Sequence, residues 1–317
     1  MIDMVRGALA VVLCMVCAHQ GNAFGTLNFL GQSAEHEKIT ALGLKPFKLG
    51  SWTLSELKGR ARVFGAVGAP DRPSRGLLFT AAAHCDGGDW LALKGYPHDK
   101  ASAVKVLSAC RKWIFDHLRK AVAAAGDLVD SDLNIVATVN TKQQPCHFSG
   151  AEDTPKCNVL AAMGLVFHAV QDFYSHSNWT DVATGRPVSV KDPPGLGGEG
   201  PIPWLDPRRS EATMPDGLIS GCFSGIPERL FCRRRVRHAD LNKDTGPINI
   251  KTGKIGRGTT PRAKGNDNFQ RAVAAAIADT EDKWRYFEER LIETYGPDRG
   301  NRIICVIRND DVAGCRK

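Results

Sequence analysis

The sequence predicts an all-α protein: a single helical domain with a central metal-binding helix, long loops and disulfide bonds. Long segments carry apolar residues at helical spacing, few segments alternate as a strand does, and the cysteines fall into couples close in sequence. A chain of 317 residues fits one large domain or two small ones. Because no internal repeat is visible, we expect one domain over residues 24–317.

Residues 1–23 have the pattern of a secretory signal peptide. Arg6 supplies a positive charge, residues 8–18 are apolar, and small residues precede the expected cleavage before Phe24. The apolar run is too short to span a bilayer, and no later segment is long and apolar enough. We therefore expect a secreted protein, extracellular or periplasmic, without an integral membrane span.

Eight cysteines follow the expected signal peptide, an even number that is typical of disulfide bonds in an exported chain. Neighbours in the sequence are the simplest partners. The expected pairs are Cys85 with Cys110, Cys146 with Cys157, Cys222 with Cys232, and Cys305 with Cys315. A zinc site made of thiolates is disfavoured, because the only C-x-x-C spacing lies in the signal peptide.

Three segments are predicted as outer helices. Residues 33–44 form the first, with Ser33 as its N-cap and Gly43 as its stop. Residues 100–125 carry a one-sided apolar stripe, which is typical of an amphipathic helix. Residues 268–295 form the last long helix.

Three more segments complete the predicted fold. Residues 157–177 are apolar on almost every side, which predicts a helix at the centre of the domain. Residues 135–139 are the one modest strand candidate. Residues 185–207 contain six prolines and five glycines, which excludes a regular element. A loop of this length is usually functional or disordered, and in a hydrolase it could form a cleft wall.

The chain is basic, with a net charge of +8 and five arginines between residues 229 and 237. A basic surface favours phosphates, anionic lipid headgroups or nucleic acid as partners. A solvated helix or loop face is the simpler interpretation of the arginine run. Peripheral contact with an anionic membrane is one expectation.

The stretch VFHAVQDFYSHSNW, residues 166–179, contains three polar residues at helical spacing. His168, Asp172 and His176 are four apart, so on a helix they lie on one side, since four residues turn by only about 40° more than a full turn. Imidazole and carboxylate are zinc ligands, and one carboxylate can bridge two ions. A polar ladder satisfied by backbone and hydroxyl groups is the alternative.

Three other histidines also have carboxylates close by in the sequence. His36 lies in AEHEKIT, His84 in AAAHCDGGDW and His238 in RHADLNKDT. Each alone fits a surface or core residue. Together with the ladder they supply enough nitrogen and oxygen ligands for two or three zinc ions.

QDFYSHSNW resembles the signature of the heterokaryon-incompatibility protein C family, a group of secreted proteins. FGTLN, the EH of the first helix and HADLNKD are also similar to that family, in short blocks between residues 24 and 250. The family looks related to zinc-dependent phospholipases C and fungal single-strand nucleases, which are all-α enzymes holding three zinc ions in a cleft.

The resemblance implies a role for each residue of the ladder and for the chain start. His168 and Asp172 match an HxxxD pair on a central helix, with the Asp bridging two zinc ions. His176 resembles the next ligand, which the enzymes space further from the Asp. His36 resembles the ligand of the first helix, and the amine and carbonyl of Phe24 would bind zinc where the enzymes have Trp.

The resemblance also implies the remaining ligands. Asp71 and His84 would complete another zinc site, and Asp71 or Asp172 would orient the attacking water. His238 would close the last site with Asp240 or Asp244; of these we take Asp240. The enzymes place a carboxylate four residues after this His, where the present chain has Asn242.

A calcium loop competes for the same stretch. Asp240-x-Asn242-x-Asp244 resembles its start, but the Gly comes late and Lys251 stands where the closing Glu is expected. Calcium is therefore less favoured than zinc. A turn rich in Asp and Asn is the simplest alternative.

Three functions remain open from the sequence. The first is a secreted zinc-dependent hydrolase of phosphoester bonds, similar to phospholipase C, with a phospholipid or another phosphoester as substrate. The second is a non-catalytic recognition protein of the incompatibility type, in which the metals are structural. The third is a zinc-dependent nuclease, which needs a base-stacking pocket that Trp90, Trp179 or Trp204 would supply.

Overall fold

The computed structural model describes residues 25, 33–60, 63–136, 145–223 and 228–316. Within these ranges the regular structure is helical and β pairing is limited to isolated bridges, which confirms the predicted all-α fold. The expected signal peptide and Phe24 lie outside the described residues. The α-helices are α2 (Glu35–Gly43), α3 (Ser51–Lys58), α4 (Ala81–His84), α5 (Lys100–Ala125), α6 (Pro155–His176), α7 (Glu228–Phe231), α8 (His238–Leu241), α9 (Pro261–Lys264), α10 (Asn268–Tyr295) and α11 (Pro297–Arg308).

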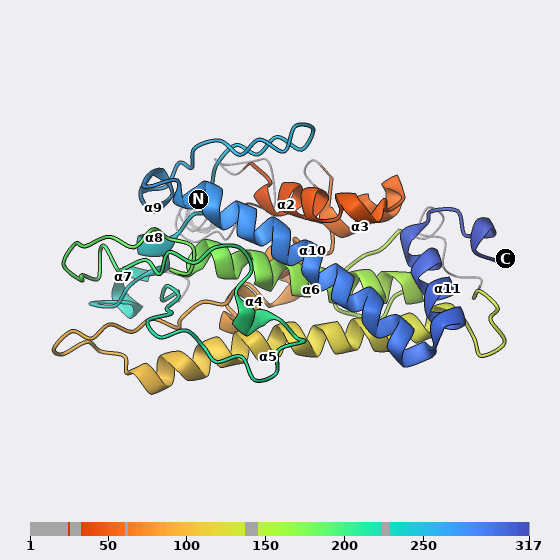
Figure 1. Cartoon of the computed structure of the whole chain (residues 1–317), viewed down its shortest axis with the longest axis horizontal. Helices are drawn as coiled ribbons and strands as arrows, with labels where there is room; N and C mark the ends of the chain where they lie inside the picture. Colours follow the sequence, from red (N-terminus) through yellow and green to blue (C-terminus); the bar gives the residue numbers. More distant parts are fainter. Residues whose placement is uncertain (1–24, 26–32, 61–62, 137–144, 224–227, 317) are drawn as a thin grey trace, which may run out of the picture.

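The long helices α5, α6 and α10 run alongside one another and form the body of the molecule (Figure 1). Every residue from Ala162 to His176 is buried, so α6 is covered on all sides by its neighbours. This burial confirms the prediction that the most evenly apolar helix lies at the centre. The short helices α2, α4 and α8 contact α6 and bring their polar side chains to it.

A buried polar network joins α6 to α10 and to the long loop. The hydroxyl of Tyr174 donates to Asp279 Oδ2 at 2.7 Å, and Asp279 also pairs with Lys283. The same hydroxyl accepts from the backbone N–H of Ile202 at 3.0 Å. All three side chains are at most 1 % exposed, so their charges and hydroxyl must be satisfied inside the protein. Residues 185–207 are irregular as predicted, apart from the 3₁₀ turn Pro203–Leu205, and this network fixes the end of the loop.

One detail of the predicted elements was wrong. Ser33 is not the N-cap of the first helix: that position is Ala34, in the left-handed region at φ 51°, and no side chain caps the helix. Instead the carboxylate of Glu35 accepts from the backbone N–H of Ser33 at 3.1 Å. Most of the strand candidate, residues 137–139, lies outside the described residues, and Ile135 forms one isolated bridge with Val129.

All four expected disulfide bonds are present in the structure. The Cα atoms of the pairs are separated by 5.0 Å for Cys85–Cys110, 5.3 Å for Cys146–Cys157, 5.8 Å for Cys222–Cys232 and 5.7 Å for Cys305–Cys315. The first bond ties the end of α4 to α5, and the third closes the loop that contains α7. Of the helices in the described ranges, none combines the length and the apolar character needed to cross a membrane.

Candidate metal centre

The helical ladder predicted from the sequence is present on the C-terminal half of α6. His168, Asp172 and His176 are each 0 % exposed and face polar side chains from α2, α4, α8 and the connecting loops. These partners form two groups, which we call the Asp172 group and the His176 group. The members of the Asp172 group are His36, Asp71, His84, His168 and Asp172, and those of the His176 group are Asp86, His176, His238 and Asp244.

Three imidazoles converge on the carboxylate of Asp172. His36 Nε2 lies 3.1 Å from Oδ1, while His84 Nδ1 and His168 Nε2 lie 2.9 and 3.0 Å from Oδ2. The two oxygens therefore face different histidines, as a bridging carboxylate would. Asp71 is at the edge, 3.7 Å from His168 Nε2 and 4.0 Å from His84 Nδ1, and its side chain is 15 % exposed.

Hydrogen bonds behind the histidines fix which ring nitrogen carries the proton. The amide nitrogen of Gln171 donates to the hydroxyls of Thr40 and Thr280, at 3.0 and 3.1 Å. Its oxygen is left to accept the Nδ1–H of His36 at 2.7 Å, so His36 Nε2 keeps its lone pair. Partners of this kind orient metal-binding histidines and set their tautomer.

The other two histidines of the Asp172 group are held in the same way. His168 Nδ1 donates to the carbonyl of Val67 at 2.8 Å, and His84 Nε2 donates to the carbonyl of Leu77 at 3.3 Å. The nitrogens left over, His168 Nε2 and His84 Nδ1, are only 3.0 Å apart. Two lone pairs at this distance repel each other unless a cation or a proton lies between them.

In the His176 group, one imidazole is flanked by two carboxylates. His176 Nδ1 lies 3.0 Å from Asp86 Oδ1, and His176 Nε2 lies 3.1 Å from Asp244 Oδ1. His238 Nε2 lies 3.3 Å from the other oxygen of Asp244, and the two imidazole rings are 4.1 Å apart. All four residues are 0 to 3 % exposed, so the group is enclosed.

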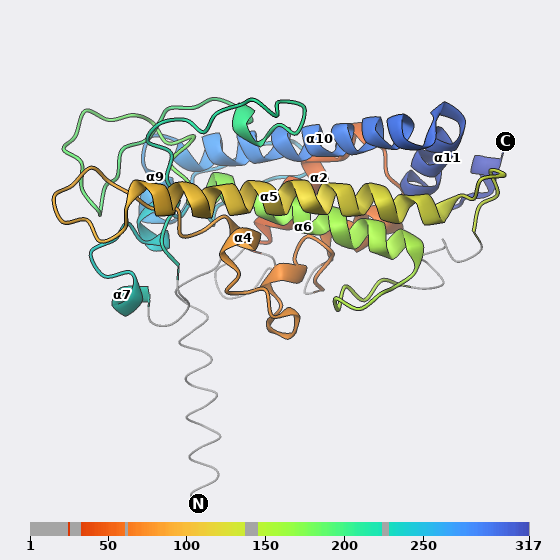
Figure 2. The ribbon, with the colours of Figure 1, turned by 90° about the horizontal axis from the view of Figure 1, so that it is seen from below.

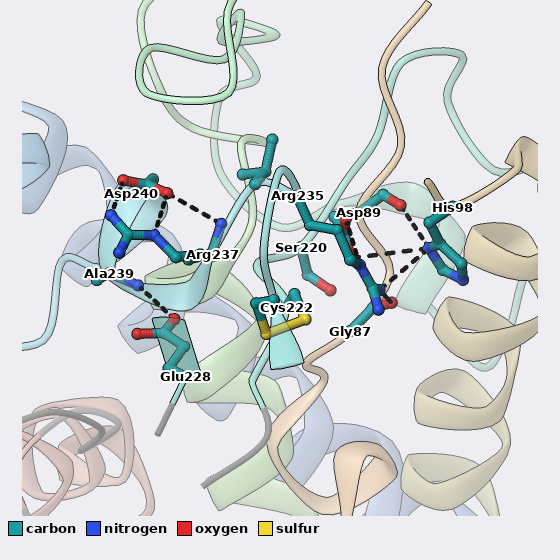
Figure 3. The surroundings of a disulfide bond; sticks show 12 residues. Gly87, Asp89, His98, Ser220, Cys222, Glu228, Arg235, Arg237, Ala239 and Asp240 are labelled. Carbon is teal, nitrogen blue, oxygen red and sulfur yellow. Dashed lines mark hydrogen bonds and ion pairs between the residues drawn. A yellow bond between two sulfur atoms is a disulfide. The ribbon is translucent and has the colours of Figure 1, made fainter. Parts of the chain in front are cut away.

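The segment that carries His238 is braced from both sides, as Figure 3 shows. The Cys222–Cys232 disulfide closes the loop before it, and Glu228 accepts from the backbone N–H of Ala239 at 3.3 Å. The carbonyl of Cys222 also accepts from the N–H of His238 at 2.9 Å. These contacts fix the backbone of the segment at His238.

The charges of the two groups depend strongly on one another. Burial by itself lowers the pKa of His168, but the carboxylates of Asp172 and Asp71 outweigh it and raise that pKa to about 9. Burial would raise the pKa of Asp172, yet the surrounding imidazoles hold it well below its usual range. The pKa of His176 is raised well above its usual range, because nearby carboxylates outweigh its burial. Each group thus attracts positive charge, as protons or as a metal ion.

Within the described ranges, some buried polar atoms of the two groups lack hydrogen-bond partners, which is compatible with a bound metal ion. Among the described residues, no well-aligned hydrogen bond reaches Asp86 Oδ1, Asp172 Oδ1, Asp244 Oδ2 or either ring nitrogen of His238. Yet the three carboxylate oxygens lie 3.0 to 3.3 Å from an imidazole nitrogen of their group, and for Asp244 Oδ2 that nitrogen is His238 Nε2. Ligands of a tetrahedral ion with bonds of about 2.0–2.1 Å are separated by roughly 3.3 Å and point at the ion instead of at each other. The two groups could therefore each hold metal.

The structure brings together most of the residues expected at the site. Among the expected ligands, Phe24 lies outside the described residues. Asp240 does not face the His176 group, because its carboxylate bonds Arg237 at 3.0 Å and Lys191 at 3.3 Å. Asp244, the other residue considered for this position, is the carboxylate beside His238. The carboxylates of Asp240 and Asp244 have different partners, which disfavours the calcium-loop alternative.

The sequence did not single out Asp86 as a ligand. Its carboxylate reaches His176 because the chain turns sharply after α4, where Cys85 has a positive φ of 54°. The signal available was its position two residues after His84 in the stretch AAAHCDGGDW.

Comparison with known proteins assigns no family to the chain. No family model matches it, and neither a curated protein nor a solved structure matches it significantly. The resemblance of the short motifs to the heterokaryon-incompatibility family therefore stays a prediction.

Proposed function

We propose that the chain is a secreted zinc-dependent hydrolase of phosphoester bonds, similar to phospholipase C in its chemistry. The observation that carries the proposal is the convergence of three oriented imidazoles on Asp172, with Asp71 partly exposed beside them. Asp172 and the three histidines would hold the metal, and the His176 group offers a further position.

The donor set favours zinc among the common metals. The two groups supply imidazole nitrogens and carboxylate oxygens, and the eight cysteines after residue 23 are all in disulfides. Magnesium and calcium prefer sites made mostly of oxygen, whereas zinc takes nitrogen and oxygen ligands in small tetrahedral sites. Calcium remains the less favoured ion.

Different residues of the Asp172 group would bind the metal and orient the water. His36, His84 and His168 would hold the metal together with Asp172, whose two oxygens face different histidines. When bound, zinc would supply Lewis acidity and lower the pKa of water towards neutrality. Asp71 would accept a hydrogen bond from the attacking water and orient it, because it is the member of its group that reaches solvent.

The tryptophans favour a lipid or small phosphoester over nucleic acid. Trp204 is 4 % exposed and packs against Phe173, with ring centres 6.5 Å apart. The indole of Trp179 donates to the carbonyl of Gly200 at 3.1 Å and is packed closely on Gly198. Two of the three rings expected to stack on bases are thus used inside the fold.

A structural metal in a non-catalytic recognition protein is the second candidate. Complete burial of the His176 group favours it, because a catalytic zinc keeps an open position for water. The Asp172 group differs in having Asp71 at an exposed edge.

Zinc content and hydrolysis, measured together, test the proposal. The protein lacking residues 1–23 would be compared with Asp172→Asn and with the control Asp279→Asn, which changes an equally buried carboxylate outside both groups. We expect zinc in the parent and the control and less in Asp172→Asn. Cleavage of a soluble choline phosphodiester should be lost with chelator and return with zinc. Full activity in the chelated protein would refute the proposal, and zinc without any hydrolysis would favour the structural role.

A further inference from the structure

An exposed apolar and basic patch lies beside the His176 group. Leu230 and Phe231 at the end of α7 are 70 % and 67 % exposed, and Phe79 just before α4 is 66 % exposed. Among the described residues, the next large apolar side chain is Val63 at 55 %. Leu230 and Phe231 are consecutive in the chain, and soluble proteins rarely expose large apolar side chains next to one another without a partner for them.

The fold holds these side chains in the open. Leu230 and Phe231 belong to the loop that the Cys222–Cys232 disulfide closes, and Cys232 itself is 0 % exposed. The guanidinium of Arg235 donates to Asp89 at 3.0 Å, just after the loop (Figure 3). The loop is thus fixed at both of its ends while its apolar residues face solvent.

The patch is connected to the metal centre by a chain of rings. Phe79 stacks on Phe223 with ring centres 6.3 Å apart, and Phe223 meets the imidazole of His238 edge-on at 5.5 Å. Phe79 also lies five residues before His84 of the Asp172 group. Figure 2 shows α7 and α4 on the same side of the long helices.

Positive charge accompanies the apolar residues. Arg233 and Arg234 directly follow the disulfide and are exposed, and the whole chain carries a net charge of +8. Apolar side chains flanked by arginines suit the interface of an anionic bilayer, where the rings enter the acyl boundary and the guanidinium groups meet phosphate.

We propose that Phe79, Leu230, Phe231, Arg233 and Arg234, here called the α7 patch, dock the protein on an anionic lipid bilayer. The metal centre then lies close to the phospholipid headgroups. The docking itself does not depend on the proposed function, because none of the five residues belongs to either metal group. Only the hydrolysis of a lipid after docking rests on the proposed function.

Vesicle sedimentation tests the docking directly. The protein lacking residues 1–23 would be mixed with vesicles of phosphatidylcholine alone or of an equimolar mixture with phosphatidylserine. The double variant Leu230→Ser, Phe231→Ser removes the apolar part, and Arg233→Glu, Arg234→Glu reverses the charge. Matched controls are Ile292→Ser, which is 37 % exposed, and Arg290→Glu, both near the far end of α10 (Figure 1).

We expect the parent and both controls to bind the anionic vesicles more tightly than the neutral ones. The Ser double variant should bind about thirtyfold more weakly, since burial of each side chain contributes a factor of roughly five to ten. The Glu double variant should lose the preference for the anionic vesicles. Folding of each variant would be checked by its melting temperature and zinc content.

Three results would overturn the inference. The first two are a parent that binds neither kind of vesicle and a Ser double variant that binds as tightly as the parent does. A parent that is dimeric and becomes monomeric in the Ser double variant would also overturn it, because the patch would then join two copies. If the parent binds the vesicles but contains no zinc and hydrolyses nothing, this inference holds and the proposed function is refuted. If the parent hydrolyses a soluble phosphodiester but does not bind the vesicles, the proposed function holds and this inference is refuted.

Discussion

Lys156 is a buried cation, and replacing it should change how the free energy of unfolding depends on pH. It lies in the first turn of α6, is 1 % exposed and donates to the carbonyl of Asn309 at 2.7 Å. Burial lowers its pKa from 10.5 to about 8, although Asp310 acts in the opposite direction. Asp310 is itself occupied by the backbone N–H groups of Trp52 and Thr53.

The lowered pKa has a definite sign for stability. Between about pH 8 and pH 10.5 the unfolded chain holds the proton of Lys156 and the folded chain has lost it, so the free energy of unfolding rises with pH. A fall from 10.5 to about 8 corresponds to about 3 kcal/mol of destabilisation while the side chain is charged. About 2 kcal/mol of this destabilisation is relieved on going from about pH 7 to about pH 10.

The substitution Lys156→Met isolates this effect. At about pH 7 the variant should be more stable by about 2 kcal/mol, because it avoids the buried charge and loses one hydrogen bond of about 1 kcal/mol. At about pH 10 the advantage should vanish. Urea unfolding of both proteins in chelator at the two pH values measures the change. The control Lys112→Met, at a side chain 74 % exposed, should show no such change. The reasoning would be refuted if the difference in free energy of unfolding between the parent and Lys156→Met were equal at both pH values.

Two further predictions concern the metal centre. Asp244→Asn should lower the zinc content, whereas Asp240→Asn should leave it unchanged because that carboxylate bonds Arg237; equal zinc loss in both variants, by elemental analysis, would contradict the assignment. Gln171→Leu should weaken zinc binding about 10- to 100-fold, because His36 loses the acceptor that orients it. Competition with a fluorescent chelator measures this, and an unchanged affinity would count against the role of the amide.

The parts of the fold that depend on short-range patterns could be predicted from the sequence. The central position of α6 follows from its evenly apolar surface, and the ladder of His168, Asp172 and His176 follows from the helical repeat alone. The disulfides could be predicted because each joins cysteines that are neighbours among the eight after residue 23, separated by 10 to 25 residues.

The choice between Asp240 and Asp244 required local geometry. The spacing between His and carboxylate in the enzymes that the motifs resemble does not contain it. Asp240 is the third residue of α8, and its carboxylate accepts from the backbone N–H of Arg237 at 3.0 Å, which caps the helix. An acidic residue at this position commonly serves the helix start, so this local signal was present in the sequence. Asp244 follows the helix, and its N–H donates to Asn242 Oδ1 at 2.9 Å in a turn that brings the carboxylate towards His176. The Asp and Asn of this stretch therefore shape the turn as well as the site.

The candidate metal centre also depends on a close contact that no pattern of polar residues reveals. Gly164 lies one turn before His168, and a Cβ at this position would be 2.4 Å from the backbone carbonyl carbon of Ala66. Only glycine lets the chain at residues 65–67 approach α6 so closely. This approach places the carbonyl of Val67 within 2.8 Å of His168 Nδ1, and the chain then continues into the turn that carries Asp71. Gly164, which has no side chain, thus determines the tautomer of His168 and the position of Asp71. For this reason the arrangement of the site follows from the packing of the fold and not from its ligands alone.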